Sequence, residues 1–270
     1  MNNPEQLPVE VVSEANAITS MIKGEVDIQI QTAKQYPRVI SKSKERILEV
    51  ATSDQETADS CFYLLPRGGK SIEGPSTRLA EIVANSWGNL RIGSRVLDVG
   101  EKSVVCQGVV HDLETNVAYQ TEVRRKITDR NGKRYTEDMI NMTANAGCSI
   151  AMRNAIFKAV PKAVIKTLEK EIKHAAGGDA RTLPTRIKTA FKYFKDKYSH
   201  DEKKLLAFLD KRKMEDVDLE DLQKLNGVRV AIEDGELTAA NAFSLPEEEK
   251  PKQKKKGIVN LEDVKVKETE

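Results

Sequence analysis

Six of the eleven residues from Arg124 to Arg134 are basic, within the stretch QTEVRRKITDRNGKRYT at residues 120–136. The stretch directly follows a run that is typical of a β-strand, so the positive charge collects at the end of a hairpin. A cationic surface of this kind can follow a phosphate backbone, with binding that falls steeply as salt is added. The chemistry that this stretch suggests is therefore the binding of a polyanion.

Further basic residues extend this candidate site on both sides. Those expected on the sheet or at its hairpin end are Arg91, Arg95, Arg124, Arg125, Lys126, Arg130, Lys133 and Arg134, and those expected on the following helix are Arg153, Lys158 and Lys162. Tyr135 stands beside the basic turn and is the best candidate for stacking on a base, which contributes about 1–3 kcal/mol per base. Aromatic residues make up only 5% of the chain, so Trp87, Tyr63 and Tyr119 are more readily interpreted as core.

Catalytic interpretations have less support. RGGKS at 67–71 resembles a phosphate loop, but Leu64 stands where the motif requires its first glycine. Asp112, Glu122 and Arg124 could serve a metal-dependent nuclease, although DLETN at 112–116 gives Asp112 a structural reason as a turn residue. His111 fits the end of a strand, and Cys148 has no histidine partner in view. The sequence predicts neither an enzyme nor a cofactor.

The composition limits the class of protein. A chain of 270 residues, 39% hydrophobic and 32% charged, fits a soluble protein with one sizeable domain and an accessory module. It contains no run of eighteen apolar residues, so we expect no membrane span, and its start lacks the pattern of a signal peptide. Three widely spaced cysteines suggest buried thiols in a reducing cytoplasm, and three histidines without a C-x-x-C pair make a zinc site improbable.

The net charge of +2 conceals a segregation of charge along the chain. Residues 61–174 carry 18 basic and 12 acidic residues, and 181–213 carry 11 and 4, whereas 214–249 carry 2 and 11. This pattern predicts a polyanion-binding core followed by an acidic accessory module. The alternative interpretation is an ordinary solvated surface, because blocks of charge are common.

Periodicity predicts the elements that position these residues. Helical spacing covers 8–50, and Ser76 or Thr77 caps a helix that ends at Trp87-Gly88-Asn89. Three β-rich runs then read as antiparallel strands: IGSRVLDV, KSVVCQGVVHD and NVAYQTEVRRKIT. In the third, one face carries Val117, Tyr119, Thr121 and Val123, and the other carries Ala118, Gln120, Glu122, Arg124 and Lys126.

A long helix is predicted at 143–176, with Pro161 kinking or restarting it. Helical patterning resumes at 184–243 and gives a small module of three or four pieces. The fold class expected is α+β: a helix, a three-stranded antiparallel sheet and a long helix, between a helical N-terminal region and a small helical C-terminal module. The predicted divisions are 1–60 (N-terminal helical region), 61–176 (DNA-binding core), 177–183 (linker), 184–243 (helical module) and 244–270 (disordered tail).

Three segments together carry a resemblance: GPSTRLAEIVANSWGNLRIGSRV, VVCQGVVHDLETNVAYQTEVRRKIT and ANAGCSIAMRNAIFKAVPKAV. They resemble the phage single-strand annealing recombinases of the RecT, Redβ and Erf type, within the superfamily of ring-forming strand-annealing proteins. The resemblance covers roughly residues 61–175. It implies ATP-independent annealing of complementary single strands on oligomeric rings or filaments. Arg124, Arg125 and Lys126 would line the strand side of a groove, and Arg153 and Lys158 its helix side.

The resemblance also implies partners. Single-stranded DNA and further copies of the chain are expected, together with a host single-strand-binding protein or a partner exonuclease at the helical module. The scarcity of aromatic residues departs from the family's pattern. Three other functions stay open at this point: a protein that coats single strands without annealing them, a structural or regulatory protein whose basic surface meets acidic partners, and a nuclease.

Overall fold

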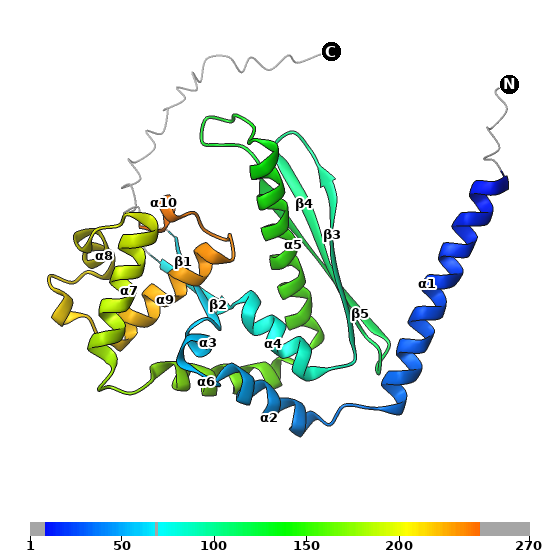
Figure 1. The fold of residues 1–270 in the computed structure, drawn as a ribbon, viewed down its shortest axis with the longest axis horizontal. Coiled ribbons are helices and arrows are strands. Elements are labelled where there is room, and N and C mark those ends of the chain that lie inside the picture. Colours follow the sequence, from blue (N-terminus) through cyan, green and yellow to red (C-terminus); the bar gives the residue numbers. More distant parts are fainter. Residues whose placement is uncertain (1–8, 68–69, 244–270) are drawn as a thin grey trace, which may run out of the picture.

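The alternating β-branched residues form the central sheet of the computed structural model, which describes residues 9–67 and 70–243. Strands β3 (Leu90–Val99), β4 (Ser103–Asp112) and β5 (Val117–Lys126) pair antiparallel in the order β3-β4-β5. A β-bulge between Val96 and Asp98 shifts the register in β3. The predicted α+β class, with three antiparallel strands and a following long helix, is confirmed (Figure 1).

One face of the sheet packs against helix α5 (Glu137–Ala159). Small residues allow the close approach: a Cβ at Gly108 would lie 2.3 Å from the backbone carbonyl of Ala151. Thr121 Oγ1 donates to the same carbonyl oxygen at 2.6 Å. The face of β5 that the sequence assigned to Val117, Tyr119, Thr121 and Val123 is therefore the one toward α5, and the alternation prediction is correct for this strand.

The main core lies between α5 and three other helices. Helix α4 (Thr77–Trp87) begins as predicted, with the Ser76 side chain accepting from the N–H of Leu79. It packs against α2 (Ile40–Ala51), and α2 in turn contacts α6 (Lys162–Gly177), which also contacts the short helix α3 (Gln55–Asp59). Trp87 is only 3% exposed, which agrees with its interpretation as a core residue.

Helix α1 (Val9–Gln35) extends away from the rest of the molecule, as Figure 1 shows in dark blue. Large apolar side chains are exposed along it, including Ile18 at 60%, Met21 at 68% and Ile28 at 65%. Its attachment point is Arg38, whose guanidinium binds Asp112 and Glu114 at the turn between β4 and β5. This buried network holds the N-terminal region to one end of the sheet.

A second, two-stranded sheet was missed by the sequence prediction. Strands β1 (Phe62–Arg67) and β2 (Lys70–Pro75) form an antiparallel hairpin in the segment that the sequence divided at its glycines and prolines. The C-terminal helices pack on this hairpin through α9 (Leu219–Glu233), where Gly227 lies against Leu64. Leu64 shares a core with the other C-terminal helices: α7 (Leu183–Tyr198), α8 (Glu202–Leu209) and α10 (Ala239–Ala242), with a 3-10 turn at Met214–Asp216.

Two helix predictions need correction. The long helix begins at Glu137, six residues before the predicted start, because the Thr136 side chain caps it by accepting from the N–H of Met139. It ends at Ala159, and Pro161 starts a separate helix, α6, so the restart is the correct alternative. The sequence suggests two short helices, LEDLQKL and ELTAANAF, on either side of NGVRVAIEDGE, but helix α9 continues from Leu219 to Glu233 and so includes most of that segment. The predicted disordered tail at 244–270 lies outside the described residues.

No described helix combines the length and the apolar character that a membrane crossing requires. Across residues 9–67 and 70–243, histidine, cysteine and carboxylate side chains also form no cluster that could hold a metal ion.

Candidate nucleic-acid interface

The sheet face opposite α5 carries four of the predicted basic residues. The strand register places Arg91 and Arg95 of β3 on this open face together with Arg124 and Lys126 of β5. Amide groups connect the two strands, because Arg95 Nε donates to Gln107 Oε1 at 3.0 Å and Gln107 Nε2 reaches Gln120 Oε1 at 3.4 Å. Asp98 and Glu122 also lie on this face, so four cations outnumber two carboxylates on it.

A hollow of about 470 Å³ lies on this open face where it meets helix α1. Val26 of α1 borders it, and Arg91 Nη1 donates to Gln29 Oε1 of the same helix at 3.1 Å. The sheet contributes the backbone of Gly93 and the side chains of Arg95 and Gln120, among others. The hollow therefore presents guanidinium and amide donors above a flat strand surface.

A second hollow, of about 580 Å³, lies on the other side of β5, between that strand and α5. Asn154 and Lys158 of α5 line it together with Gln120, Thr121 and Glu122. Strand β5 is an edge strand in the described sheet, so its outer backbone groups pair with no described strand. Cationic and amide side chains thus stand on both sides of an accessible strand edge.

The turn after β5 is fastened by its own charged residues. The Asp129 carboxylate accepts from the backbone N–H groups of Asn131 and Lys133, both at 2.8 Å, and Gly132 adopts a positive φ of 82°. Arg134 donates to the carbonyl oxygens of Gly100 and Glu101 and so ties this turn to the β3–β4 turn. The predicted DRNGK turn is present, but much of the donor capacity of Arg134 is used within the protein.

Tyr135 lies at the rim of a small apolar cluster. Its side chain is half-buried and packs against Val104, Cys106, Ile127, Ile140 and Ala144. Its backbone N–H donates to the carbonyl oxygen of Ile127 at 2.9 Å. Only part of the ring is therefore accessible, and stacking of a base on Tyr135 stays a prediction. Tyr119 is 38% exposed at the other end of the sheet, on the face toward α5.

Arg153 is buried, contrary to its predicted place in an open groove. It forms an ion pair with Glu236, from the loop between α9 and α10, in which both side chains are less than a tenth exposed. Its guanidinium also lies 4.7 Å from the centroid of the Tyr63 ring. Arg125 points toward α5 and donates to the carbonyl oxygen of Gly235, in the same loop. The sequence signal that could have indicated this pairing is the acidic block at 214–249.

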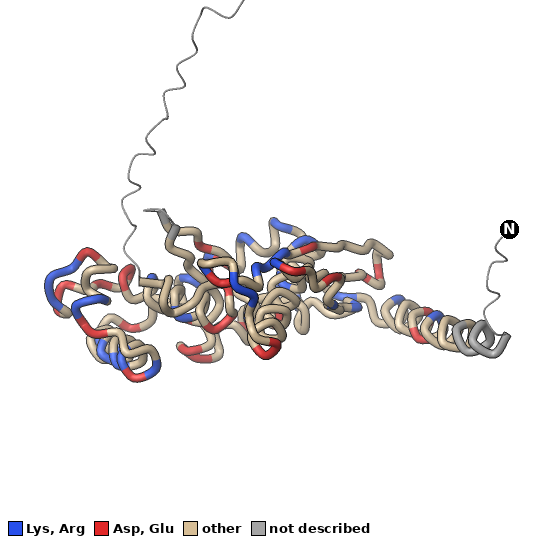
Figure 2. The backbone as a smooth tube through the Cα atoms, turned by 90° about the horizontal axis from the view of Figure 1, so that it is seen from above, with Lys and Arg blue, Asp and Glu red and all other residues tan. Residues whose placement is uncertain are grey.

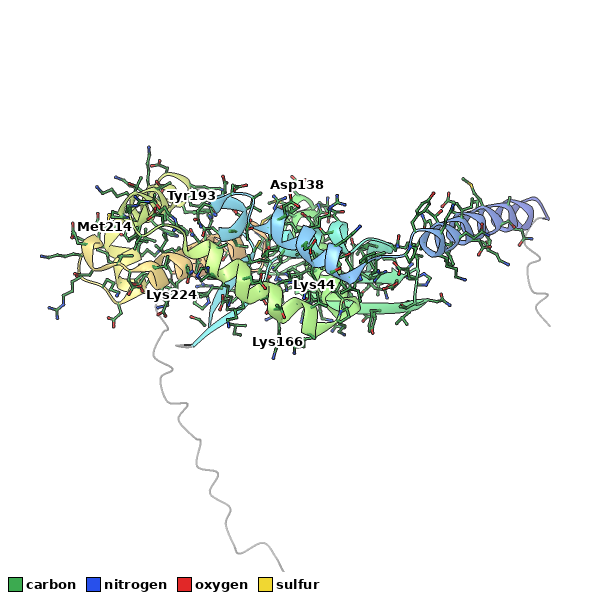
Figure 3. All side chains as sticks on the ribbon, turned by 90° about the horizontal axis from the view of Figure 1, so that it is seen from below. Lys44, Asp138, Lys166, Tyr193, Met214 and Lys224 are labelled. Atoms are coloured by element: carbon green, nitrogen blue, oxygen red, sulfur yellow. The ribbon has the colours of Figure 1, made fainter. Side chains whose placement is uncertain are left out.

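The remaining two basic residues of the helix side do not share one helix. Lys158 is exposed near the end of α5, whereas Lys162 begins α6, which runs in a different direction along the base of the molecule (Figure 1). Lys166, which follows Lys162 by one turn, is labelled on α6 at the lower border of the molecule in Figure 3. Lys162 therefore does not extend the row that Lys158 begins on α5.

The charges as a whole do not form one uniformly basic side. In Figure 2, Lys and Arg positions are interspersed with Asp and Glu over the middle of the molecule and over the C-terminal helices. Arg130, at the turn after β5, donates to Asn241 of the C-terminal helices. The cations predicted to line one groove are therefore divided. Four lie on the open face, Lys158 lies with Glu122 in the second hollow, and Arg125, Arg130 and Arg153 are engaged by the C-terminal segment.

Asp112 and His111, which were considered for catalysis, have structural partners, and the two cysteines buried in the core, Cys61 and Cys106, are held as thiols. Burial alone would raise the pKa of Asp112, but hydrogen bonds from Arg38 and from the N–H groups of Thr115 and Glu114 outweigh it and lower that pKa. Burial raises the pKa of the Cys61 thiol to about 12 and that of Cys106 to about 11, which keeps both protonated. His111 bonds Asn116 across the β4–β5 turn, consistent with its interpretation as a strand-end residue.

The candidate interface therefore consists of two hollows on either side of the edge strand β5, which arginine, lysine, amide and glutamate side chains border. No protein-family model, curated protein or solved structure matches this chain.

Proposed function

We propose that this chain binds single-stranded DNA along strand β5 and promotes the annealing of complementary strands without ATP. The observation that carries the proposal is the flanking of an accessible edge strand by cationic groups on both sides: Arg95, Arg124 and Lys126 on the open face and Lys158 on the other. A phosphate backbone that follows such a strand gains charge-assisted contacts along its length.

The amide groups suit the same ligand. Gln120 is exposed on the open face, where the buried Gln107 holds its side chain through a 3.4 Å bond, and Asn154 stands beside Lys158 in the second hollow. Amides can donate to phosphate oxygens and accept from base edges, so they hold a strand without reading one sequence. In the proposed mechanism, phosphates supply the binding energy and base pairing with a second strand supplies the specificity.

The family resemblance in the sequence extends this proposal to partners. We propose that several copies act together on one strand as a ring or a filament, within the cytoplasm of the host cell. A single-strand-binding protein or an exonuclease is the partner proposed for the C-terminal helices. A protein that only coats single strands is the rival function, and it would slow annealing instead of accelerating it.

The test uses the full chain and a fluorescently labelled thirty-nucleotide oligo-dT. Arg124→Ala combined with Lys126→Ala should weaken binding in fluorescence anisotropy at low salt by about tenfold or more, because two cations that pair with phosphates are removed. The slope of log K against log salt should become shallower by about 0.7 for each phosphate that the variant no longer neutralises. The matched control is Lys166→Ala with Lys170→Ala on α6, which removes the same charge from exposed positions outside both hollows.

The second measurement is the pairing rate of two complementary labelled oligonucleotides, with and without protein. The wild type should accelerate pairing without ATP, and the α6 control should do the same. An absence of oligo-dT binding at low salt would refute the proposed function, and binding combined with slower pairing would favour the coating protein. An equal weakening in both double variants would show that net charge, not the β5 surface, determines binding.

A further inference from the structure

Three successive residues of the loop between α9 and α10 contact the central part of the fold, residues 61–176. Figure 1 shows this loop, in orange, reaching toward α5. Asp234 accepts from the N–H of Thr77 at 3.2 Å and from its hydroxyl at 2.6 Å, at the start of α4. The carbonyl oxygen of Gly235 accepts from Arg125. Glu236 binds Arg153. We call residues 234–236 the acidic clasp.

We infer that the acidic clasp occupies a phosphate site of the interface, and that a bound strand must displace it. This inference rests on the proposed function, because it assigns a regulation to the same surface. The Glu236 carboxylate and the Gly235 carbonyl oxygen stand where the oxygens of a phosphodiester would stand on Arg153 and Arg125. Both arginines belong to β5 and α5, whose residues line the second hollow, although the arginines themselves do not line it.

The contacts of Arg153 favour a replaceable occupant. Besides Glu236, its guanidinium contacts only the Asn154 side chain, through two bonds of 3.2 and 3.3 Å, and the ring of Tyr63, among the interactions that the structure describes. A guanidinium has five N–H donors, and a phosphate oxygen can take the place of the one Glu236 oxygen that Arg153 Nη1 now contacts. Asn154 lines the second hollow, so a strand in that hollow reaches the group beside Arg153.

The clasp also depends on one glycine. Gly235 has a φ of +71°, and a Cβ there would lie 2.7 Å from the Cβ of Ala146 on α5. Any side chain at this position would strain the loop and push it away from α5 without changing the charge. Gly235→Ala therefore opens the clasp by a steric route, whereas Glu236→Gln weakens it by an electrostatic one.

The expected effect follows from the fraction of molecules in which the clasp is open. A clasp that is closed for about 70–90% of the time weakens strand binding by about three- to tenfold, because only open molecules offer the site. Both clasp variants should therefore bind labelled thirty-nucleotide oligo-dT about three- to tenfold more tightly than the wild type. The matched control is Glu220→Gln, which removes one negative charge from the exposed first turn of α9.

The experiment compares the four full-length proteins by fluorescence anisotropy at one salt concentration, with circular dichroism melting curves for each. If the wild type binds oligo-dT and both clasp variants bind it equally well or more weakly, the clasp is refuted and the proposed function still stands. If none of the four proteins binds, the proposed function itself is refuted. Tighter binding by Glu220→Gln to the same extent would also refute the clasp, because net charge would then explain the gain.

A further measurement needs no variant and decides the matter if Gly235→Ala does not fold. Amide hydrogen exchange is followed in the wild type with and without saturating oligo-dT. Displacement of the clasp predicts faster exchange at residues 234–243 in the bound state. Unchanged or slower exchange there, in a protein that binds oligo-dT, would show that the loop stays in place and would overturn the inference.

Discussion

Arg38 and Arg153 are both buried arginines that bind carboxylates from a distant part of the chain, but their surroundings differ. Arg38 makes three side-chain bonds of 2.6–2.9 Å to Asp112 and Glu114 and stacks over Trp87 at 5.0 Å. Asp112 in turn accepts from the N–H groups of Glu114 and Thr115. We call this set, Arg38 with Asp112 and Glu114, the turn clamp.

Arg153, in contrast, has one carboxylate partner, and that partner comes from a short loop 83 residues away. The turn clamp fixes the backbone of a tight turn and the entry to helix α2, so no member can move without breaking several bonds. Under the inference above, the acidic clasp leaves as a unit, because Asp234, Gly235 and Glu236 belong to one loop. The two arginines are similarly buried but differ in the number of bonds to carboxylates, which is three for Arg38 and one for Arg153.

The largest expected effect is on the turn clamp. Asp112→Ala should lower the free energy of unfolding by about 3–5 kcal/mol, because it leaves the buried Arg38 charge without its main partner. Denaturant unfolding followed by circular dichroism measures this decrease. Asp179→Ala is the control, since the Arg181–Asp179 pair is exposed and its removal should leave the midpoint unchanged. A decrease no larger than that expected for Glu236→Gln would show that the carboxylate partners of Arg38 contribute no more stability than the partner of Arg153.

A smaller effect is expected at the acidic clasp. Glu236→Gln should lower the free energy of unfolding by about 1–2 kcal/mol, because the amide keeps an acceptor for Arg153 and the loop can admit water. The same unfolding experiment applies. A decrease as large as that of Asp112→Ala would mean that the clasp is a permanent part of the fold, which would contradict its displacement by a strand.

The smallest effect is a change of slope with pH. Because the pKa of Asp112 is lowered in the folded protein, its stabilisation is present above the unfolded pKa, about 4, and is lost as pH falls through the folded value. Wild-type stability should therefore decline as pH falls below about 5, and Asp112→Asn should decline less steeply. Equal slopes in unfolding titrations would show that Asp112 contributes no such linkage.

The sequence predicted the elements whose signals are local. The alternation from Val117 to Lys126 gave the two faces of β5, and Ser76 marked the start of α4. It did not predict the β1–β2 hairpin, because two glycines and nearby prolines obscure the alternation in such short strands. Nor did it predict the early start of α5, whose capping residue Thr136 lies beyond a basic turn rather than before an apolar run.

The candidate site was less predictable than the fold for a physical reason. Charge on a strand can be read from the strand alone, so Arg95, Arg124 and Lys126 could be expected on an open face. Burial of Arg153 depends on Glu236, which belongs to another region of the chain. The residues around Arg153 do not indicate which carboxylate it contacts. Tyr135 is likewise half-buried against residues such as Val104, which lies outside its own segment. Long-range partners decide which cations stay available.

The turn clamp lies at the inner end of the long helix α1. At 1.5 Å per residue its 27 residues span about 40 Å, and the chain leads from its end into Arg38. A protein that packed on the exposed side chains of Ile18, Met21 and Ile22 would bind the part of this helix that lies away from the β4–β5 turn. A force applied to the outer part of α1 would be borne by the turn clamp together with the Arg91–Gln29 hydrogen bond to the sheet.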